Sequence, residues 1–122
     1  MSPQEMATLA KHPLITLGGH TITHVQLASL DRAGQSKEIV DSLNFVESVA
    51  DCPVETFSYP YGLWGRDFNQ KSIESVEKSG LNHALAADIN VVTSRTNPFK
   101  IPRLWISDVG QPQFGHYLGR WL

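Results

Sequence analysis

Apolar residues follow two spacings along the chain, and segments of the two kinds alternate. Ile39, Leu43 and Val46 recur every three or four residues, the spacing that buries one side of a helix. Short runs rich in β-branched and aromatic residues follow the pattern of strands instead. The expected helices cover residues 3–10, 32–50, 67–79 and a short stretch beyond Gly110, and the expected strands cover residues 14–17, 54–59, 83–87 and 101–106.

This alternation predicts an α/β fold with about four parallel strands joined by right-handed helical crossovers. Ligand sites in such folds lie beyond the carboxyl ends of the strands. His20 and His24 follow the first expected strand, Pro60 and Tyr61 the second, and Asp88 the third. We therefore expect these residues at one rim of the sheet.

Length and composition limit the class of protein. The chain has 122 residues, of which 41% are hydrophobic and 18% charged, as in a single globular domain over residues 1–122. The net charge of −2 gives no basic footprint, so we expect no nucleic-acid partner. No apolar run is long enough to span a membrane, and no secretory signal opens the chain, which as given predicts a cytoplasmic protein.

The segment Gly18-Gly19-His20-Thr21-Ile22-Thr23-His24 is the first candidate site. Two imidazoles four residues apart reach one point if the backbone between them is helical or tightly turned. Neutral imidazole is the commonest side-chain metal ligand near neutral pH. The pattern predicts a metal site. The alternative is that one histidine caps the turn and the other lies on the surface.

Residues 19–24, together with Phe57-Ser58-Tyr59-Pro60-Tyr61-Gly62, resemble the second and third motifs of the NodB-like polysaccharide deacetylases, carbohydrate esterase family 4. Residues 97–103 also fit that family. The resemblance implies a distorted (β/α) barrel with fewer than the regular eight strands. It implies a divalent metal, most often zinc, held by one aspartate and two histidines. It also implies hydrolysis of N-acetyl or O-acetyl groups on a polysaccharide, the partner we expect.

Carried over by motif, the resemblance makes His20 and His24 metal ligands. It makes the backbone N–H of Tyr61 the donor to the reaction oxyanion, with Pro60 fixing the turn. Three further residues are candidates for substrate binding: Trp64, Arg103 and, as a weak match, Asp88. The alternatives are a loop anchor for Trp64 and a structural ion pair for Arg103.

The chain also departs from the family pattern. The first motif, Thr-Phe-Asp-Asp, which supplies the catalytic base and the third metal ligand, is absent from the sequence. Ser58 stands where the third motif often has an arginine, and His116 does not match the family's catalytic histidine. The sequence therefore resembles the carboxyl portion of a truncated domain.

From these departures we expect weak metal binding and little activity from the isolated chain. The alternative is a non-catalytic carbohydrate-binding or structural remnant of such a domain. Members of the family are often secreted or periplasmic, so the location stays open. A partial sheet also leaves its edges exposed, and exposed edges invite pairing between chains, so we expect self-association.

Overall fold

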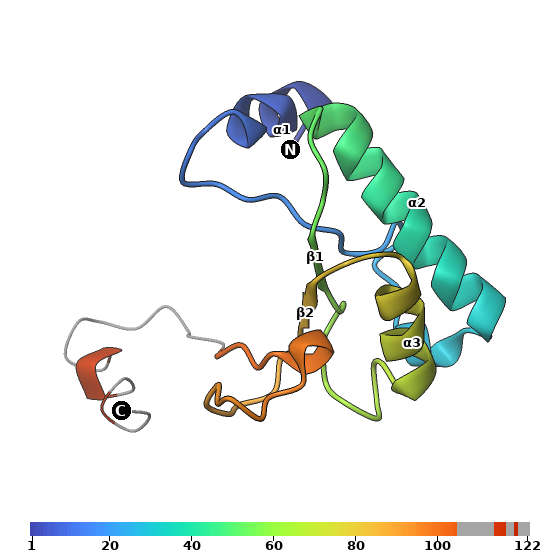
Figure 1. Ribbon diagram of the computed structural model, residues 1–122, viewed down its shortest axis with the longest axis vertical. Coiled ribbons are helices and arrows are strands. Elements are labelled where there is room, and N and C mark those ends of the chain that lie inside the picture. Colours follow the sequence, from blue (N-terminus) through green and yellow to red (C-terminus); the bar gives the residue numbers. More distant parts are fainter. Residues whose placement is uncertain (105–113, 117–118, 120–122) are drawn as a thin grey trace.

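In the part of the chain that the structure describes, two short parallel strands form the centre of the fold, helices α2 and α3 lie on one side of them, and α1 lies against α2 (Figure 1). The structure is a computed structural model that describes residues 1–104, 114–116 and 119. The helices are α1 (Pro3–Ala10), α2 (Arg32–Ala50) and α3 (Gln70–Lys78), the strands are β1 (Thr56–Ser58) and β2 (His83–Leu85), and the 3₁₀ turns are Leu27–Ser29 and Pro98–Lys100.

The sheet is parallel throughout, as the alternating pattern predicts. Phe57 of β1 lies opposite Ala84 of β2. Single parallel bridges extend the sheet on both sides, from Gly19 to Phe57 and from Ile101 to Leu85. The spatial order is therefore the Gly19 segment, β1, β2 and the Ile101 segment. Of the four expected strands, those over 54–59 and 83–87 form with three residues each, and the described part of the one expected over 101–106 contributes only the bridge at Ile101.

The prediction of a strand over residues 14–17 is wrong. A turn over residues 11–14 reaches into this stretch, with the amide of Ile15 donating to the His12 carbonyl at 3.0 Å, and residues 15–17 are irregular. Leu14 is 88% exposed. An apolar run with nothing to pack against gains little from forming a strand. The pairing occurs instead at Gly19, which lies against β1. Residues 105–106 of the fourth expected strand and most of the expected tail helix lie outside the described residues.

The helices begin where polar side chains cap them. Asp31 accepts a hydrogen bond from the amide of Gly34 and so starts α2. Asn69 accepts from the amides of Lys71 and Ser72, so α3 begins at Gln70 rather than at residue 67. Sequence pattern alone placed the start of this helix three residues too early, because Asp67 also has the properties of a first-turn residue.

The hydrophobic core fills the space between the sheet and helices α2 and α3. Phe57, Tyr59 and Phe68 are fully buried, and the rings of Tyr59 and Phe68 stack with centroids 3.8 Å apart. Side chains alternate along a strand, so Ser58 and Leu85 lie on the opposite face from Phe57 and Ala84. Figure 1 shows α2 and α3 together on one side of the strands. The face that carries Ser58 is the open face of the sheet.

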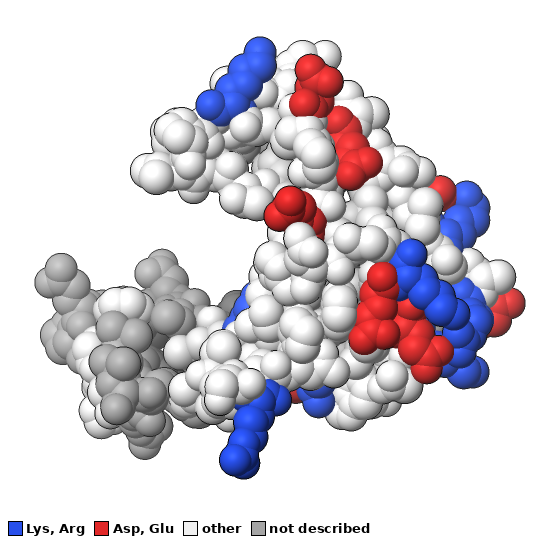
Figure 2. All heavy atoms as spheres, viewed as in Figure 1, with Lys and Arg blue, Asp and Glu red and all other residues white. Residues whose placement is uncertain are grey.

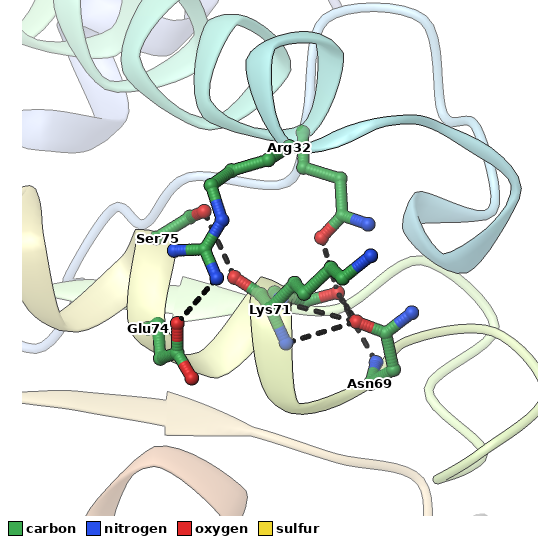
Figure 3. Close-up of polar contacts among 7 residues, drawn as sticks. Arg32, Asn69, Lys71, Glu74 and Ser75 are labelled. Carbon is green, nitrogen blue, oxygen red and sulfur yellow. Dashed lines mark hydrogen bonds and ion pairs between the residues drawn. The ribbon is translucent and has the colours of Figure 1, made fainter.

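Polar contacts fix α3 against α2 (Figure 3). The guanidinium of Arg32 lies 2.8 Å from the Glu74 carboxylate, and this exposed pair contributes at most about 1 kcal/mol. The buried hydroxyl of Ser72 donates to the Gln35 side chain at 2.8 Å. Because a buried polar group costs free energy when it is unpaired, this second contact specifies the register of the two helices.

Charged side chains are unevenly distributed. Figure 2 shows basic and acidic groups side by side over α2 and α3, whereas the hollowed side of the molecule shows mostly uncharged atoms. Among the described residues, no helix is long and apolar enough to cross a lipid bilayer.

Candidate active site

Gly19 brings the first histidine to the sheet. Its amide donates to the Thr56 carbonyl at 3.0 Å, and its carbonyl accepts from the Ser58 amide at 2.9 Å. A Cβ atom at this position would lie 2.7 Å from a methyl carbon of Leu43 and 2.9 Å from the Phe57 ring. Only glycine lets the backbone pass between α2 and β1, and His20 follows directly at the carboxyl end of the sheet.

The ring of His20 is oriented by a backbone carbonyl. Its Nδ1 lies 2.6 Å from the carbonyl oxygen of Ser58. A carbonyl only accepts, so Nδ1 carries the proton and Nε2 keeps its lone pair for a metal. Burial lowers the pKa of His20; the Ser58 hydrogen bond raises it, the charges of His24 and Arg103 lower it, and the net shift is downward. The ring is therefore neutral near neutral pH.

A tight turn returns His24 to His20. Thr21 and His24 both adopt left-handed backbone angles, with φ of 62° and 57°. The two imidazole centroids lie 4.9 Å apart with the ring planes at 70°. The structure thus brings together the two histidines that the sequence selects, by a turn rather than by a helix.

Glu38 of α2 holds this turn, a contact that sequence reasoning missed. Its carboxylate accepts from the amides of Ile22 and Thr23 at 2.9 and 3.0 Å and from the Thr23 hydroxyl at 2.9 Å. Burial raises the pKa of Glu38, but these hydrogen bonds outweigh it and leave the pKa below its ordinary value. The sequence gives no signal for this role, because Glu38 falls within the expected solvent-facing side of α2.

The Pro60-Tyr61 corner lies beside the histidines. The rings of His24 and Tyr61 are 4.9 Å apart. Tyr61 and Gly62 have φ of 58° and 78°, and the carbonyl of Gly62 accepts from the Ala87 amide at 2.8 Å. Within the described part of the chain, the backbone N–H of Tyr61 donates to no protein acceptor. The corner therefore presents a free donor next to the histidine pair.

Asp67 fixes the loop that follows the Pro60-Tyr61 corner. Sequence reasoning also missed Asp67 as a site residue. Its buried carboxylate accepts from the Leu63 amide at 2.9 Å and from the Gln26 side chain at 3.0 Å, and it pairs with Arg66 at 2.8 Å. The hydrogen bond from Arg66 is the main reason that the pKa of Asp67 is low. Because Gln26 follows His24 closely, Asp67 ties the histidine loop to the loop after Tyr61.

Two of the three substrate-binding candidates meet around Lys100. Its ammonium lies 4.4 Å from the centroid of the Trp64 ring and 3.7 Å from the Asp88 carboxylate. Trp64 also packs edge-on against Phe68 at 5.3 Å while remaining 41% exposed. The ring is thus a loop anchor with an accessible part, and its role in substrate binding stays a prediction.

Arg103 lies on the open face of the sheet with His20. Both line a hollow of about 360 Å³ together with Ser58. The Nε of Arg103 donates to the Ala86 carbonyl at 3.0 Å, and among the described residues Arg103 forms no ion pair. Its contacts place it near His20, in the same hollow.

The histidine pair fits a divalent metal as two ligands of a larger set. Catalytic zinc takes three protein ligands and a water. In the described portion of the chain, no group of three or more His, Cys, Asp and Glu side chains is placed to hold a metal. The donor atoms are imidazole nitrogens, one ring being oriented by a backbone carbonyl, and they are of the kind that zinc prefers.

Comparisons with known proteins identify the family of this chain. The profile described as "Polysaccharide deacetylase" matches residues 1–84. A poly-β-1,6-N-acetyl-D-glucosamine N-deacetylase of Staphylococcus aureus is 34% identical over 67 residues, which are 55% of this chain and 21% of that protein. The YxkH protein of Bacillus subtilis, named as a polysaccharide deacetylase, is 23% identical over 97% of this chain and 41% of its own length.

A solved structure extends the likeness to the fold. The crystal structure of a polysaccharide deacetylase from Bacillus cereus superposes with a TM-score of 0.80 at 19% identity. The match covers 95% of this chain and 36% of that protein. The architecture is therefore that of a deacetylase domain of the NodB type, of which this chain spans a part.

The chain belongs to the polysaccharide deacetylase family, a family of hydrolases that are in general metal-dependent. The resemblance drawn from residues 19–24 and 57–62 is thereby confirmed. The chain spans less than half the length of the relatives that it matches.

Proposed function

We propose that this chain supplies the histidine pair and the oxyanion donor of a metal-dependent deacetylase acting on an N-acetylated polysaccharide. One observation carries the proposal: the rings of His20, His24 and Tyr61 meet at the carboxyl end of a parallel sheet, with successive centroids 4.9 Å apart. A lone pair on an oriented imidazole and an unpaired backbone N–H are then within one small site.

Each of these residues has a distinct task. His20, through Nε2, and His24 hold the metal, most often zinc in this family. When bound, such a metal would polarise the acetyl carbonyl and lower the pKa of a bound water to about 7. The N–H of Tyr61 donates to the negative charge that develops on the acetyl carbonyl oxygen, a contribution of about 3 kcal/mol. Pro60 restricts the backbone so that this N–H keeps its direction.

The ligand set and the acid–base groups are incomplete in this sequence. Two histidines leave the third zinc ligand unassigned, and no carboxylate of the described residues joins them. A carboxylate must also take the proton of the attacking water. We therefore expect metal affinity orders of magnitude below that of a three-ligand site, and little acetate release by the chain alone.

The substrate class follows from a relative and from the surface near the corner. The Staphylococcus aureus relative is named for poly-β-1,6-N-acetyl-D-glucosamine, which makes that polymer the first substrate to test. Trp64 offers a partly exposed aromatic face, and Asp88 and Lys100 add polar groups beside it. Flat aromatic rings with flanking polar groups suit sugar rings, so this cluster is our candidate subsite for a neighbouring sugar unit.

A second candidate is a carbohydrate-binding module without catalysis. The observation that favours it is the missing carboxylate ligand together with the intact Trp64 cluster. The two functions differ in one measurable respect: a binding module retains its affinity for the polymer in a metal-free buffer and releases no acetate when any other polypeptide is supplied.

The open sheet edge supports self-association as a further proposal. In the described part of the chain, the backbone amides of Gly18 and His20 donate to no protein acceptor, so this edge offers unpaired groups. Light scattering at micromolar concentration checks this. We expect a mass above one chain, and a monomer contradicts the proposal.

Acetate release tests the function directly. The chain is incubated with N-acetylglucosamine oligomers and zinc, alone and with a polypeptide that supplies a family Thr-Phe-Asp-Asp segment. We expect release only in the second case, and its loss in His20→Ala and His24→Ala. Release that is unchanged in both variants contradicts the proposed role of the histidines.

A further inference from the structure

A polar hollow of about 330 Å³ lies in the loop that connects β2 to the 3₁₀ turn Pro98–Lys100. We call it the loop hollow, and it shares no residue with the hollow that His20 and Arg103 line. Most of the residues in its wall are polar or charged: Asp88, Asn90, Thr93, Arg95, Thr96, Asn97 and Lys100. Lys100 connects the loop hollow to Trp64, because its ammonium also lies 4.4 Å from the centroid of the Trp64 ring.

The polar groups that this wall leaves available are mostly hydrogen-bond donors. The Oδ1 of Asn90 accepts from the next amide along the chain at 2.8 Å, and the Oδ1 of Asn97 accepts from the Phe99 amide, also at 2.8 Å. The NH₂ groups of both side chains remain as donors. The hydroxyl oxygen of Thr96 likewise accepts from the Thr93 amide at 2.9 Å. A ligand that fits the loop hollow must therefore offer acceptors.

The loop hollow also carries an excess of positive charge. One acidic and two basic side chains line it, those of Asp88, Arg95 and Lys100. The Asp88 carboxylate is already paired with the Lys100 ammonium, at 3.7 Å. Within the described part of the chain, the Arg95 guanidinium has no ion-pair partner. A cationic ligand is therefore repelled here, whereas an uncharged ligand is not.

We propose that the loop hollow and the Trp64 ring select an acetylated sugar unit over a deacetylated one. An acetamido group is uncharged, and its carbonyl oxygen accepts hydrogen bonds from the donors of the wall. The amine that remains after deacetylation is protonated near neutral pH and only donates, so both its charge and its hydrogen bonds are mismatched. The inference rests on the proposed function for its ligand, an N-acetylated polysaccharide, but it uses neither the histidine pair nor a metal.

The test compares two ligands on the metal-free chain, prepared on a chelating resin. They are the trimer of N-acetylglucosamine and the trimer of glucosamine, titrated at about pH 6, where the amines are charged, and at constant ionic strength. The indole N–H of Trp64 and the side-chain NH₂ of Asn97 report binding in the NMR spectrum. We expect saturable shifts with the acetylated trimer and at least about fivefold weaker binding of the glucosamine trimer. Equal or tighter binding of the glucosamine trimer, or binding of neither, overturns the proposal.

Variants of Lys100 show whether its charge makes the selection. Lys100→Gln removes a positive charge and frees the Asp88 carboxylate, so the discrimination should fall to about twofold or less. Lys100→Arg keeps the charge and should discriminate like the wild type. Lys11→Gln makes the same change in net charge on an exposed residue at the end of α1 and should also discriminate like the wild type. Discrimination that is unchanged in Lys100→Gln overturns the proposal.

Asn97→Asp tests the argument from hydrogen-bond donors. The substitution keeps an oxygen for the Phe99 amide and replaces the free NH₂ with a second carboxylate oxygen. We expect this variant to bind the glucosamine trimer more tightly than the wild type does. A preference for the acetylated trimer as strong as that of the wild type contradicts the donor role of Asn97 and with it the proposal.

Failure of this inference can be told apart from failure of the proposed function. Acetate release in the assay with an added polypeptide, combined with equal binding of the two trimers, overturns the selection and leaves the function in place. Discrimination that depends on Lys100, in a chain that releases no acetate with the added polypeptide, supports the selection and contradicts the enzyme.

Discussion

Two glycines near the Tyr61 corner share a backbone conformation but differ in their surroundings. Gly62 and Gly65 have φ of 78° and 79°. A Cβ at Gly62 would lie 2.7 Å from the Ala87 amide nitrogen and 2.9 Å from the Ala87 Cβ, whereas a Cβ at Gly65 has no atom within 4 Å. Replacing each with alanine therefore separates backbone strain from steric overlap.

The magnitudes follow from these contacts. A left-handed alanine costs about 1 kcal/mol at either site. At Gly62 the overlap with backbone atoms cannot be relieved by a side-chain rotation, and overpacking of this kind adds about 2 kcal/mol. We expect Gly62→Ala to lose about 3 kcal/mol of unfolding free energy and Gly65→Ala about 1 kcal/mol. At about 4 °C for each kcal/mol, the Tm values differ by about 8 °C.

Urea denaturation followed by circular dichroism measures both variants against the wild type. Gly62→Ala should also weaken any interaction that depends on the Tyr61 N–H, because relief of the overlap moves the corner away from Ala87. Equal losses of stability in the two variants would refute the reasoning, since strain alone would then explain both.

Three further changes test the supports of the site. Glu38→Gln should cost about 1–2 kcal/mol, because it weakens three hydrogen bonds to the histidine turn. The pKa of Glu38 is lower in the folded chain, so this stabilisation is complete above about pH 4.3 and is lost as the pH falls through the folded pKa. Urea titrations at pH 7 and pH 3 check this, with Asp41→Asn on the same helix as the control. A difference between wild type and Glu38→Gln that is as large at pH 3 as at pH 7 would contradict it. Asp67→Asn should cost about 2 kcal/mol in thermal unfolding, because Asp67 is 1% exposed and its carboxylate is fully hydrogen-bonded; a loss near zero would show that it does not brace the loops. Trp64→Ala should weaken binding of N-acetylglucosamine oligomers at least about fivefold in a metal-free buffer, and unchanged affinity removes the candidate subsite.

Sequence patterns predicted the features of this fold that depend on local spacing. The apolar stripe of Ile39, Leu43 and Val46 located α2, and the alternation of segments predicted parallel pairing. The pattern failed at residues 14–17, because an apolar run forms a strand only when a neighbour pairs with it. Whether Leu14 has such a neighbour is not encoded within the run itself.

In the candidate site too, sequence patterns identified the residues that belong to local motifs and missed those that act through contacts between distant segments. His20, His24 and Tyr61 were selected by motif, and the structure brings their rings together. Glu38 is hydrogen-bonded to Thr23, from which it is separated by 15 residues of sequence. Asp67 is hydrogen-bonded to Gln26, from which it is separated by 41 residues. Contacts at such separations depend on how elements pack, and one sequence does not record them. An Arg-Asp pair in a turn after glycine, as at Arg66-Asp67, is a local signal that could have indicated the role of Asp67.

The most direct test of the site is zinc binding by the wild-type chain, His20→Ala and His24→Ala, followed by calorimetry and by the NMR signals of the imidazole rings. We predict one zinc per chain, bound at micromolar or weaker affinity, with both rings perturbed together and binding lost in either variant. Zinc that leaves both rings unchanged, or that binds equally well in the variants, would contradict a shared metal site.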